Sequence, residues 1–480
     1  MMDSVPDHDA EHRGGAASAV RGFGVLAGAN IIGQALGFAA LAIVARRIGA
    51  SALGNYNFAL SLAMYFGLLA NPGVGYIATR DVSLQPGRVS SVVSESISLQ
   101  AFASVIAYVL IVTLAPWLTP NGQARSLVPI VGLSLIAGAL SLDSVLLALR
   151  SRVPVAVARV AGQVVYAALV PILVTRTSGP SPYAWLNLLG IAVTAAIISG
   201  VLWHKRAWRF ITPRPSALWT RLRRSTGIGY SVTMIQLYNR ADMLLLGYLA
   251  TSRDVGVYAV ANRLPYSVVT FANLWIQANF PLAVVTMRED PARFRADVSR
   301  VLTAATVVAI AIACGAVVFP SRLMAALFGH AFSAAGRPFA ILTAAMALVL
   351  IEAILSNILI AGSRDKRYAQ IVTLAACVNI GLNLVLIPSL AASGSALATL
   401  VTEALLVVMT LVATRSIVGL PRLDVARLGR GAACVALMCG AMVALGTVSV
   451  WLALFAGAAV FAASAAVFRV FDPALWRRHQ

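Results

Sequence analysis

The stretch RPFAILTAAMALVLIEAILSNILIA, residues 337–361, decides the fold class of this chain. It carries only two charged side chains, Arg337 and Glu352. A run of about 20 predominantly apolar residues is long enough to cross the roughly 30 Å hydrocarbon core of a bilayer as a helix. Comparable runs recur along the whole sequence. The chain is therefore predicted to be an all-α polytopic membrane protein.

The composition agrees with this prediction. The 480 residues are 60% hydrophobic and only 11% charged, whereas a soluble domain carries about 25% charged residues. A net charge of +20 could suit a nucleic-acid partner. The basic residues are spread over short loops, however, and membrane topology explains that distribution better. No nucleic-acid partner is expected.

The apolar runs predict fourteen spanning helices in two six-helix lobes plus two C-terminal helices. The helices are expected at about 20–45, 56–79, 92–115, 126–149, 155–175, 183–203, 226–250, 256–285, 298–319, 337–361, 368–387, 394–414, 431–449 and 451–470. The predicted divisions are a disordered cytoplasmic tail (1–19), an N-lobe (20–203), a basic cytoplasmic linker (204–225), a C-lobe (226–414), the two extra helices (431–470) and a cytoplasmic tail (471–480).

Lys and Arg positions predict the orientation. With the N-terminus inside, 28 of the 37 Lys and Arg residues fall on the cytoplasmic side and seven on the outer side. Cytoplasmic loops carry the excess of basic residues in membrane proteins. Both termini are therefore expected in the cytoplasm, which requires an even number of spans.

The two halves share a motif. Gly54 and Tyr56 follow the first helix, and Gly256 and Tyr258 follow the seventh, at a constant offset of 202 residues. Since each half has an even number of helices, the repeats would be parallel and related by an axis along the membrane normal. Two such lobes could enclose a central cavity and rock about it.

These motifs, with Ala45-Arg46-Arg47-Ile48-Gly49 and the sequence RADMLLLG at residues 240–247, resemble the multidrug/oligosaccharidyl-lipid/polysaccharide exporter superfamily. Within it the chain is most similar to Wzx-like polysaccharide flippases. The resemblance implies a V-shaped two-lobe fold and alternating access in a bacterial cell (inner) membrane. The implied cargo is an undecaprenyl-pyrophosphate-linked oligosaccharide, moved from the inner to the outer leaflet for cell-surface polysaccharide biosynthesis. A polysaccharide polymerase and glycosyltransferases are candidate partners, besides membrane lipids.

Two alternatives belong to the same superfamily. One is a multidrug or cation antiporter, which should carry carboxylates in its first-half cavity to bind cationic drugs. The other is a peptidoglycan-precursor flippase, which composition does not exclude. No catalytic signature, phosphate-binding loop or Cys/His metal spacing is present in the sequence, so neither an enzyme activity nor a cofactor or metal site is expected.

Two arginines, Arg240 and Arg263, lie inside predicted spans. A guanidinium inside a bilayer is costly and normally faces a water-filled cavity or a partner. Since a guanidinium can donate two parallel hydrogen bonds to a phosphate, these arginines predict a cavity for an anionic cargo. An ion pair between Asp242 and Arg263, which lie at similar predicted depth, is the structural alternative for the second arginine.

A polar stripe accompanies Arg263 on the eighth predicted helix. Asn262, Tyr266, Asn273 and Gln277 fall on one helical face. Amides could bind sugar hydroxyls, and a tyrosine ring could stack on a pyranose. The alternative is hydrogen bonding between helices. The first helix carries a similar pair, Asn30 and Gln34, which could line the cavity or serve packing.

The second half also carries embedded polar and acidic residues. Asp242, Glu352, Glu403, Asn379 and Asn383 are candidates for a proton or Na⁺ coupling site. The alternative is that protonated carboxyls and amides simply hydrogen-bond each other.

In the first half, Asp143 is expected to pair with Arg150 or Arg152 at the cytoplasmic end of the fourth helix.

Overall fold

The computed structural model describes residues 8–71, 73–207, 211–267, 269–270, 283–419 and 421–471. The side chains of residues 8–23, 86 and 226–240 lie outside the description. Within these ranges the chain forms α-helices and two short 3₁₀ helices, and no strand. The helices divide into two compact units, Met1–Arg240 (unit 1) and Ala241–Gln480 (unit 2). Each unit is considered by itself.

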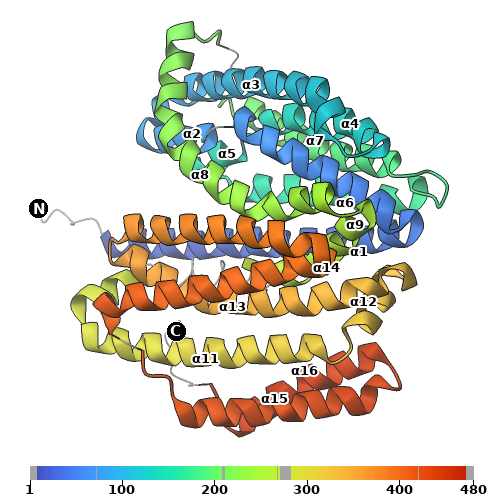
Figure 1. The fold of residues 1–480 in the computed structure, drawn as a ribbon. Helices are drawn as coiled ribbons and strands as arrows, with labels where there is room; N and C mark the ends of the chain where they lie inside the picture. The colour runs from blue at the N-terminus through green and yellow to red at the C-terminus, as the bar shows by residue number, and fades with distance from the viewer. Residues whose placement is uncertain are drawn as a thin grey trace, which may run out of the picture. The chain divides into compact units, whose positions relative to one another are not determined.

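Unit 1 is a bundle built around a long first helix (Figure 1). Its α1 packs against α6 and α4, and α6 and α7 lie side by side. The elements are α1 (His8–Ala70), α2 (Val74–Leu84), η1 (Pro86–Arg88), α3 (Val89–Leu118), α4 (Gly122–Ala139), α5 (Asp143–Ala148), α6 (Arg152–Leu173), α7 (Ser181–His204) and the first part of α8 (Pro215–Leu249).

A break at Gly49 divides α1 between the first and second predicted spans, and the second, predicted at 56–79, leaves α1 at Ala70 and continues in α2. Gly49 has φ 77° and ψ 176°, a conformation that glycine adopts at low cost because it has no Cβ. The first span begins at His8, inside the predicted tail, because Ala10, Ala16, Ala17 and Ala19 favour a helix there. Pro215 likewise begins α8 inside the predicted linker. Both helices are therefore longer than their apolar runs.

Unit 2 consists of long antiparallel helices. Its α13 packs along α14 and α11, while α15 and α16 form a hairpin against α11 (Figure 1). The elements are α9 (Ser252–Arg263), α11 (Pro291–Val317), α12 (Pro320–Phe328), η2 (His330–Ala335), α13 (Gly336–Ala361), α14 (Asp365–Val418), α15 (Val425–Gly446) and α16 (Val450–Val467). The last 9 residues of α8 also belong to this unit.

A second break lies inside α14. Ala391 has φ 46° and ψ −126°, three residues after Pro388. The chain folds back tightly there, since a Cβ on Gly394 would lie only 2.3 Å from the Leu386 carbonyl oxygen. The break falls between the predicted helices 368–387 and 394–414, so α14 contains both.

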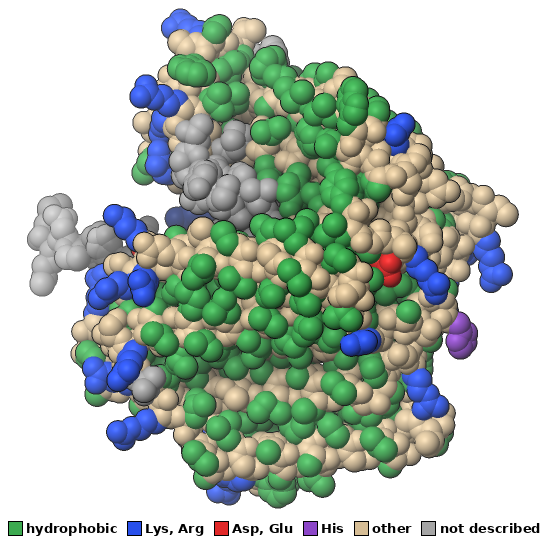
Figure 2. Space-filling view, in the orientation of Figure 1, with side chains coloured by type: hydrophobic (Ala, Val, Ile, Leu, Met, Phe, Trp, Pro, Cys, Tyr) green, Lys and Arg blue, Asp and Glu red, His purple; other side chains and the backbone are tan. Residues whose placement is uncertain are grey.

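The length and polarity of the helices fit a bilayer. Ten described stretches are long and apolar enough to span it, and the stretches Gly24–Ala70 and Asp365–Val418 each hold one of the two breaks. The predicted helices 226–250 and 256–285 are only partly described. On unit 2, apolar side chains cover the middle of the helices and basic side chains lie at their ends (Figure 2). The prediction of an all-α polytopic membrane protein is confirmed.

Three arginines bind the carbonyls at helix ends. Arg47 donates to the Pro171 and Val174 carbonyl oxygens, both at 2.6 Å, at the end of α6. Arg322 and Arg430 bind the last carbonyls of α15 and α16 in the same way, at 3.1 and 2.9 Å. The last four carbonyls of a helix have no partner within it. These arginines satisfy some of them and place positive charge where the helix dipole favours it.

Candidate functional site

Unit 1 contains a cavity of about 340 Å³ between α4, α6 and α7. Ser141, Gln163, Tyr166, Asn187 and Thr194 supply its polar side chains. The remaining lining residues are glycines and one isoleucine, so no charged side chain reaches the cavity. It is therefore a partly open pocket among membrane-spanning helices, and the described side chains that line it are uncharged.

The close approach of α6 and α7 forms one side of this cavity. A Cβ on Gly162 would lie 2.1 Å from Thr194 Oγ1 and 2.4 Å from the Gly190 carbonyl oxygen. Only glycine allows two helix backbones to come this close, as in other small-residue contacts between membrane helices. Thr194 then donates hydrogen bonds to the carbonyls of Gly190 and Ala158, at 2.9 and 3.3 Å.

The predicted pair Asn30 and Gln34 lies next to this cavity but does not line it. Both side chains are half-buried on α1. Between them, a Cβ on Gly33 would lie 3.8 Å from Cγ of Gln163. The polar face of α1 thus packs beside the residue of α6 that enters the cavity. The prediction that Asn30 and Gln34 line a central cavity between the lobes stays a prediction.

In unit 2, Asn262, Arg263 and Tyr266 lie at the surface. The helix that carries the first two begins with a capping box, in which Thr251 and Asp254 bind each other's backbone N–H groups. Arg263 is exposed, Tyr266 is 51% exposed and Asn262 is half-buried. Arg263 has no hydrogen bond or ion pair with any described residue. Its guanidinium is therefore available to a ligand.

Three predicted site residues are not characterised by the structure. Asn273 and Gln277 lie outside the described residues. Arg240 lies within α8, but its side chain is outside the description. Their assignment to a cavity stays a prediction.

Asp242 is bound to a tyrosine of the next helix. The Tyr258 hydroxyl donates a 2.6 Å hydrogen bond to Asp242 Oδ2, and Thr399 of α14 interacts with the same hydroxyl. Arg263 does not pair with Asp242. The structural alternative, an Asp242–Arg263 ion pair, is therefore not formed, and Tyr258 of the repeat motif binds Asp242 instead.

Two asparagines of α14 form a buried network with the second half of the same helix. Asn383 donates to the Asn379 side-chain oxygen at 3.0 Å, and Asn379 donates to Thr402 Oγ1 at 3.3 Å. Oδ1 of Asn383 has no hydrogen-bond partner in the described structure. A buried oxygen of this kind is costly unless a donor or a cation satisfies it.

The two predicted glutamates are both buried. Glu352 and Glu403 are 8% and 7% exposed. Both lie near the Tyr368 hydroxyl, and Glu352 also interacts with Ser356. Oε1 of Glu352 lacks a hydrogen-bond partner among the described residues. Tyr368 therefore contacts Glu352 directly and interacts with Glu403 only electrostatically.

The second half of α14 connects these three polar groups. Thr399 faces Tyr258, Thr402 binds Asn379, and Glu403 lies near Tyr368. At 1.5 Å per residue, the positions 399–403 span about 6 Å of helix. The five predicted coupling residues thus lie along one polar stripe inside unit 2.

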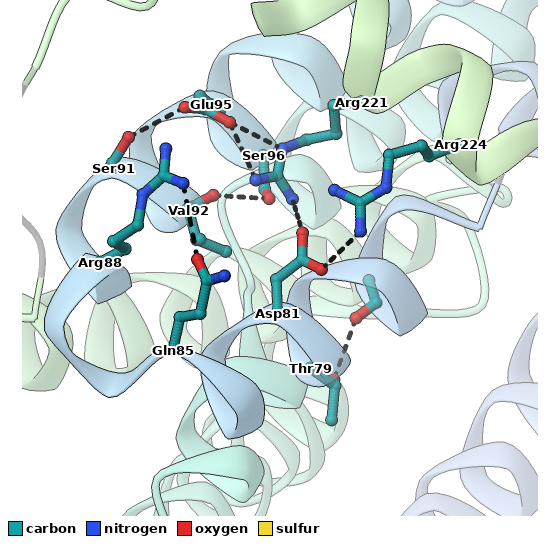
Figure 3. Close-up of polar contacts among 11 residues, drawn as sticks. Thr79, Asp81, Gln85, Arg88, Ser91, Val92, Glu95, Ser96, Arg221 and Arg224 are labelled. Carbon is teal, nitrogen blue, oxygen red and sulfur yellow. Dashed lines mark hydrogen bonds and ion pairs between the residues drawn. The ribbon is translucent and has the colours of Figure 1, made fainter.

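A separate ion-pair cluster, which sequence reasoning missed, fixes the start of α8 to unit 1 (Figure 3). Arg221 Nε and Nη2 donate to Glu95 Oε2 at 3.1 and 2.8 Å, and Nη1 lies 3.5 Å from Asp81 Oδ2. Arg224 binds Asp81 at 3.0 Å, and the Ser91 hydroxyl donates to Glu95 at 2.9 Å. The sequence shows the basic segment before the seventh predicted helix. It does not show which carboxylates pair with that segment, because this depends on how the helices pack.

Asp143 pairs with Arg159 rather than with Arg150 or Arg152, which corrects the prediction. The reason is a break between α4 and α5 at residues 140–142, which puts Asp143 in the first turn of α5. In a continuous helix Asp143 would have faced the loop. The described residues contain no group of three His, Cys, Asp or Glu side chains that could hold a metal ion.

Comparison with known proteins fits this architecture. The sequence model of the family described as "Polysaccharide biosynthesis protein" matches residues 19–287, more than half of the chain. The chain belongs to this family. The resemblance to polysaccharide exporters that the sequence motifs indicated is thus confirmed at the level of this family. No curated protein sequence matches it.

Solved structures of the superfamily share the fold of this family member. The lipid II flippase MurJ in an inward closed conformation aligns with a TM-score of 0.74 at 13% identity, over 92% of this chain and 98% of that chain. An inward-facing multidrug resistance MATE family transporter aligns with a TM-score of 0.61 at 16% identity, over 87% and 96%. The eukaryotic MATE transporter AtDTX14 aligns with a TM-score of 0.54 at 14% identity, over 82% and 95%. At these identities the likeness concerns the fold alone.

Proposed function

We propose that the chain is a flippase that moves undecaprenyl-pyrophosphate-linked oligosaccharide from the inner to the outer leaflet of the cytoplasmic membrane by alternating access. The match to the polysaccharide biosynthesis family carries this proposal. The lobes 20–203 and 226–414 would reorient about the cargo, with both termini in the cytoplasm, and a polysaccharide polymerase and glycosyltransferases would act on the same lipid-linked cargo.

The chemistry of Arg263 supports an anionic head group. Its guanidinium is exposed and unpaired among the described residues, although its segment reads as membrane-spanning. A planar guanidinium binds a pyrophosphate through charge-assisted, bidentate hydrogen bonds. Asn262 and Tyr266, within one turn of Arg263, would bind the first sugar. We assign the same role to Arg240, Asn273 and Gln277, and a place near the cargo to Asn30 and Gln34.

The neutral cavity of unit 1 argues against the multidrug antiporter. A site for cationic drugs needs carboxylates, and the cavity lining contains none. An exposed arginine would in addition repel such a cargo. The peptidoglycan-precursor flippase shares the pyrophosphate chemistry, so the test below must distinguish the two.

The test uses a bacterial strain that lacks its own polysaccharide flippase and accumulates the lipid-linked oligosaccharide in the inner leaflet. Expression of this chain should restore surface polysaccharide and remove the accumulated lipid. Arg263→Ala should fail while the protein still accumulates in the membrane, and Arg263→Lys should retain only part of the activity because it lacks the second parallel hydrogen bond. Rescue of a strain depleted of its lipid II flippase, without rescue of surface polysaccharide, would instead favour the peptidoglycan precursor.

We further propose that the polar stripe of unit 2 couples transport to H⁺ or Na⁺. Asp242, Glu352, Glu403, Asn379 and Asn383 line this stripe, and two of its oxygens lack partners. A cation or a proton would satisfy such oxygens in the low dielectric of the bundle. Transport into vesicles should depend on one ion gradient, and removal of that gradient should stop it. Undiminished transport without any gradient would refute coupling and leave the flippase assignment intact.

A further inference from the structure

The cavity of unit 1 has a composition that selects for a particular class of ligand. Its polar side chains are two amides, a phenol and two hydroxyls, with no ionisable acid or base other than the phenol. A cation site would be expected to contain a carboxylate, and an anion site an arginine or lysine. A neutral ligand with several hydroxyl groups matches the lining best.

The amides are also available to a ligand. The side chains of Gln163, Asn187 and Ser141 form no hydrogen bond with other described residues, although each lies within or between membrane-spanning helices. An amide carries both donors and an acceptor. Two amides on adjacent helices can therefore bind neighbouring sugar hydroxyls in either sense. An amide without any partner in an apolar environment costs about 1–3 kcal/mol.

The size of the cavity agrees with a small ligand such as one sugar residue. About 340 Å³ lies at the lower end of the roughly 300–1,000 Å³ of small-molecule sites. It is much larger than the roughly 30 Å³ that one water occupies in the liquid. Tyr166, which is 4% exposed and packs near Tyr183 with their ring centroids 6.1 Å apart, closes the wall of the cavity at α6.

We propose that this cavity is a saccharide-binding subsite in unit 1, which takes one neutral sugar residue of the cargo. The inference rests on the proposed flippase function. Gln163 and Asn187 bind the hydroxyls, Tyr166 closes the wall, and the contact of Gly162 with Gly190 fixes the distance between α6 and α7. The subsite belongs to unit 1 and Arg263 belongs to unit 2, so each unit would recognise a different part of the cargo.

The test measures binding of free methyl glycosides to the full-length protein in nanodiscs by saturation-transfer NMR. The probes are the methyl glycosides of glucose, galactose, mannose and N-acetylglucosamine. At least one should bind the wild type. Gln163→Leu and Asn187→Leu should each weaken binding about tenfold, the effect of one lost hydrogen bond of roughly 1.4 kcal/mol. Gly138→Leu should abolish it, because a Cβ there meets no atom within 4 Å and the side chain would fill the cavity.

Two matched controls separate the subsite from general damage. Gly200→Leu adds the same side chain on α7 at another position with open space. Asn57→Leu removes an amide of unit 1 that is bonded to its own helix. Both should bind the glycosides like the wild type. Absence of binding to the wild type, or equal binding by all variants, would overturn the subsite. If Gly138→Leu does not fold, the two amide variants decide.

The transport assay distinguishes failure of the saccharide subsite from failure of the proposed flippase function. If the chain restores surface polysaccharide while no glycoside binds, the subsite fails and the flippase function stands. If a glycoside binds at the cavity but the chain restores no polysaccharide, the flippase function fails and the cavity remains a sugar site.

Discussion

Replacing Arg221 with alanine should free the first turns of α8 from the rest of unit 1. This arginine is 6% exposed and lies between the carboxylates of Asp81 and Glu95, which are 13% and 15% exposed. Its removal leaves Glu95 with a hydrogen bond from the Ser91 hydroxyl and Asp81 with its ion pair to Arg224. The neighbouring Arg224 offers a matched control, because it binds the same Asp81 while 49% exposed.

The expected magnitudes differ sharply. Breaking a buried ion pair costs about 3–5 kcal/mol, because the remaining charge is uncompensated. Since both carboxylates keep some access to water, we expect the lower end, about 3 kcal/mol for Arg221→Ala. An exposed pair is worth about 0–1 kcal/mol, which is the expectation for Arg224→Ala. At 1.4 kcal/mol per factor of ten, the difference in local opening is on the order of 30-fold or more.

Amide hydrogen exchange of residues 215–225 measures this opening directly. Exchange should accelerate about 100-fold in Arg221→Ala and at most about fivefold in Arg224→Ala. The triple variant Arg221→Met, Asp81→Asn, Glu95→Gln removes the charges together and should regain most of the protection. Equal acceleration in the two single variants would refute the reasoning, because it would mean that the buried pair does not hold α8.

Three further predictions concern other contacts. Gly162→Val should destabilise unit 1 by about 1–3 kcal/mol or more, because the new Cβ would collide with Thr194 and the Gly190 carbonyl oxygen. Thermal unfolding in detergent measures this, and an unchanged unfolding midpoint would contradict the close approach of α6 and α7. Tyr258→Phe removes the donor to Asp242 and should cost about 1–3 kcal/mol; an unfolding free energy equal to that of the wild type would show that Asp242 has another donor of equal strength. Glu352→Gln should make vesicle transport independent of the ion gradient; a gradient dependence like that of the wild type would exclude this carboxyl from coupling.

The fold could be predicted because hydrophobic length is a local property. The run at residues 337–361 became α13, with nearly the predicted ends. The positions where the chain changes direction without a loop were harder to predict from the sequence. Gly49 and Ala391 redirect continuous helices through single residues, and such a break depends on the packing on both sides. The break between α4 and α5, which changed the partner of Asp143, has the same origin.

For the candidate sites, some residues could be chosen from the sequence and others could not. A lone charge in an apolar run is visible in the sequence, so Arg263, Glu352 and Glu403 could be chosen as candidates. Which groups meet is decided in three dimensions, as the Tyr258–Asp242 hydrogen bond shows. Gln163 and Asn187 were missed because each is a single amide in an otherwise ordinary span. Gln163 lies near the middle of α6 and Asn187 lies in the first third of the next helix, α7.

The glycine contact between α6 and α7 has an evolutionary consequence. The backbones of α6 and α7 touch at Gly162 and Gly190, where neither residue has a side chain. Any substitution at these two positions would therefore force the helices apart in one large step. Family members that carry different sugars should therefore diverge at the positions of Ser141, Gln163 and Asn187, while Gly162 and Gly190 remain invariant. The preference for one sugar over another could then change through substitution of single polar side chains, while the packing of α6 against α7 stays the same.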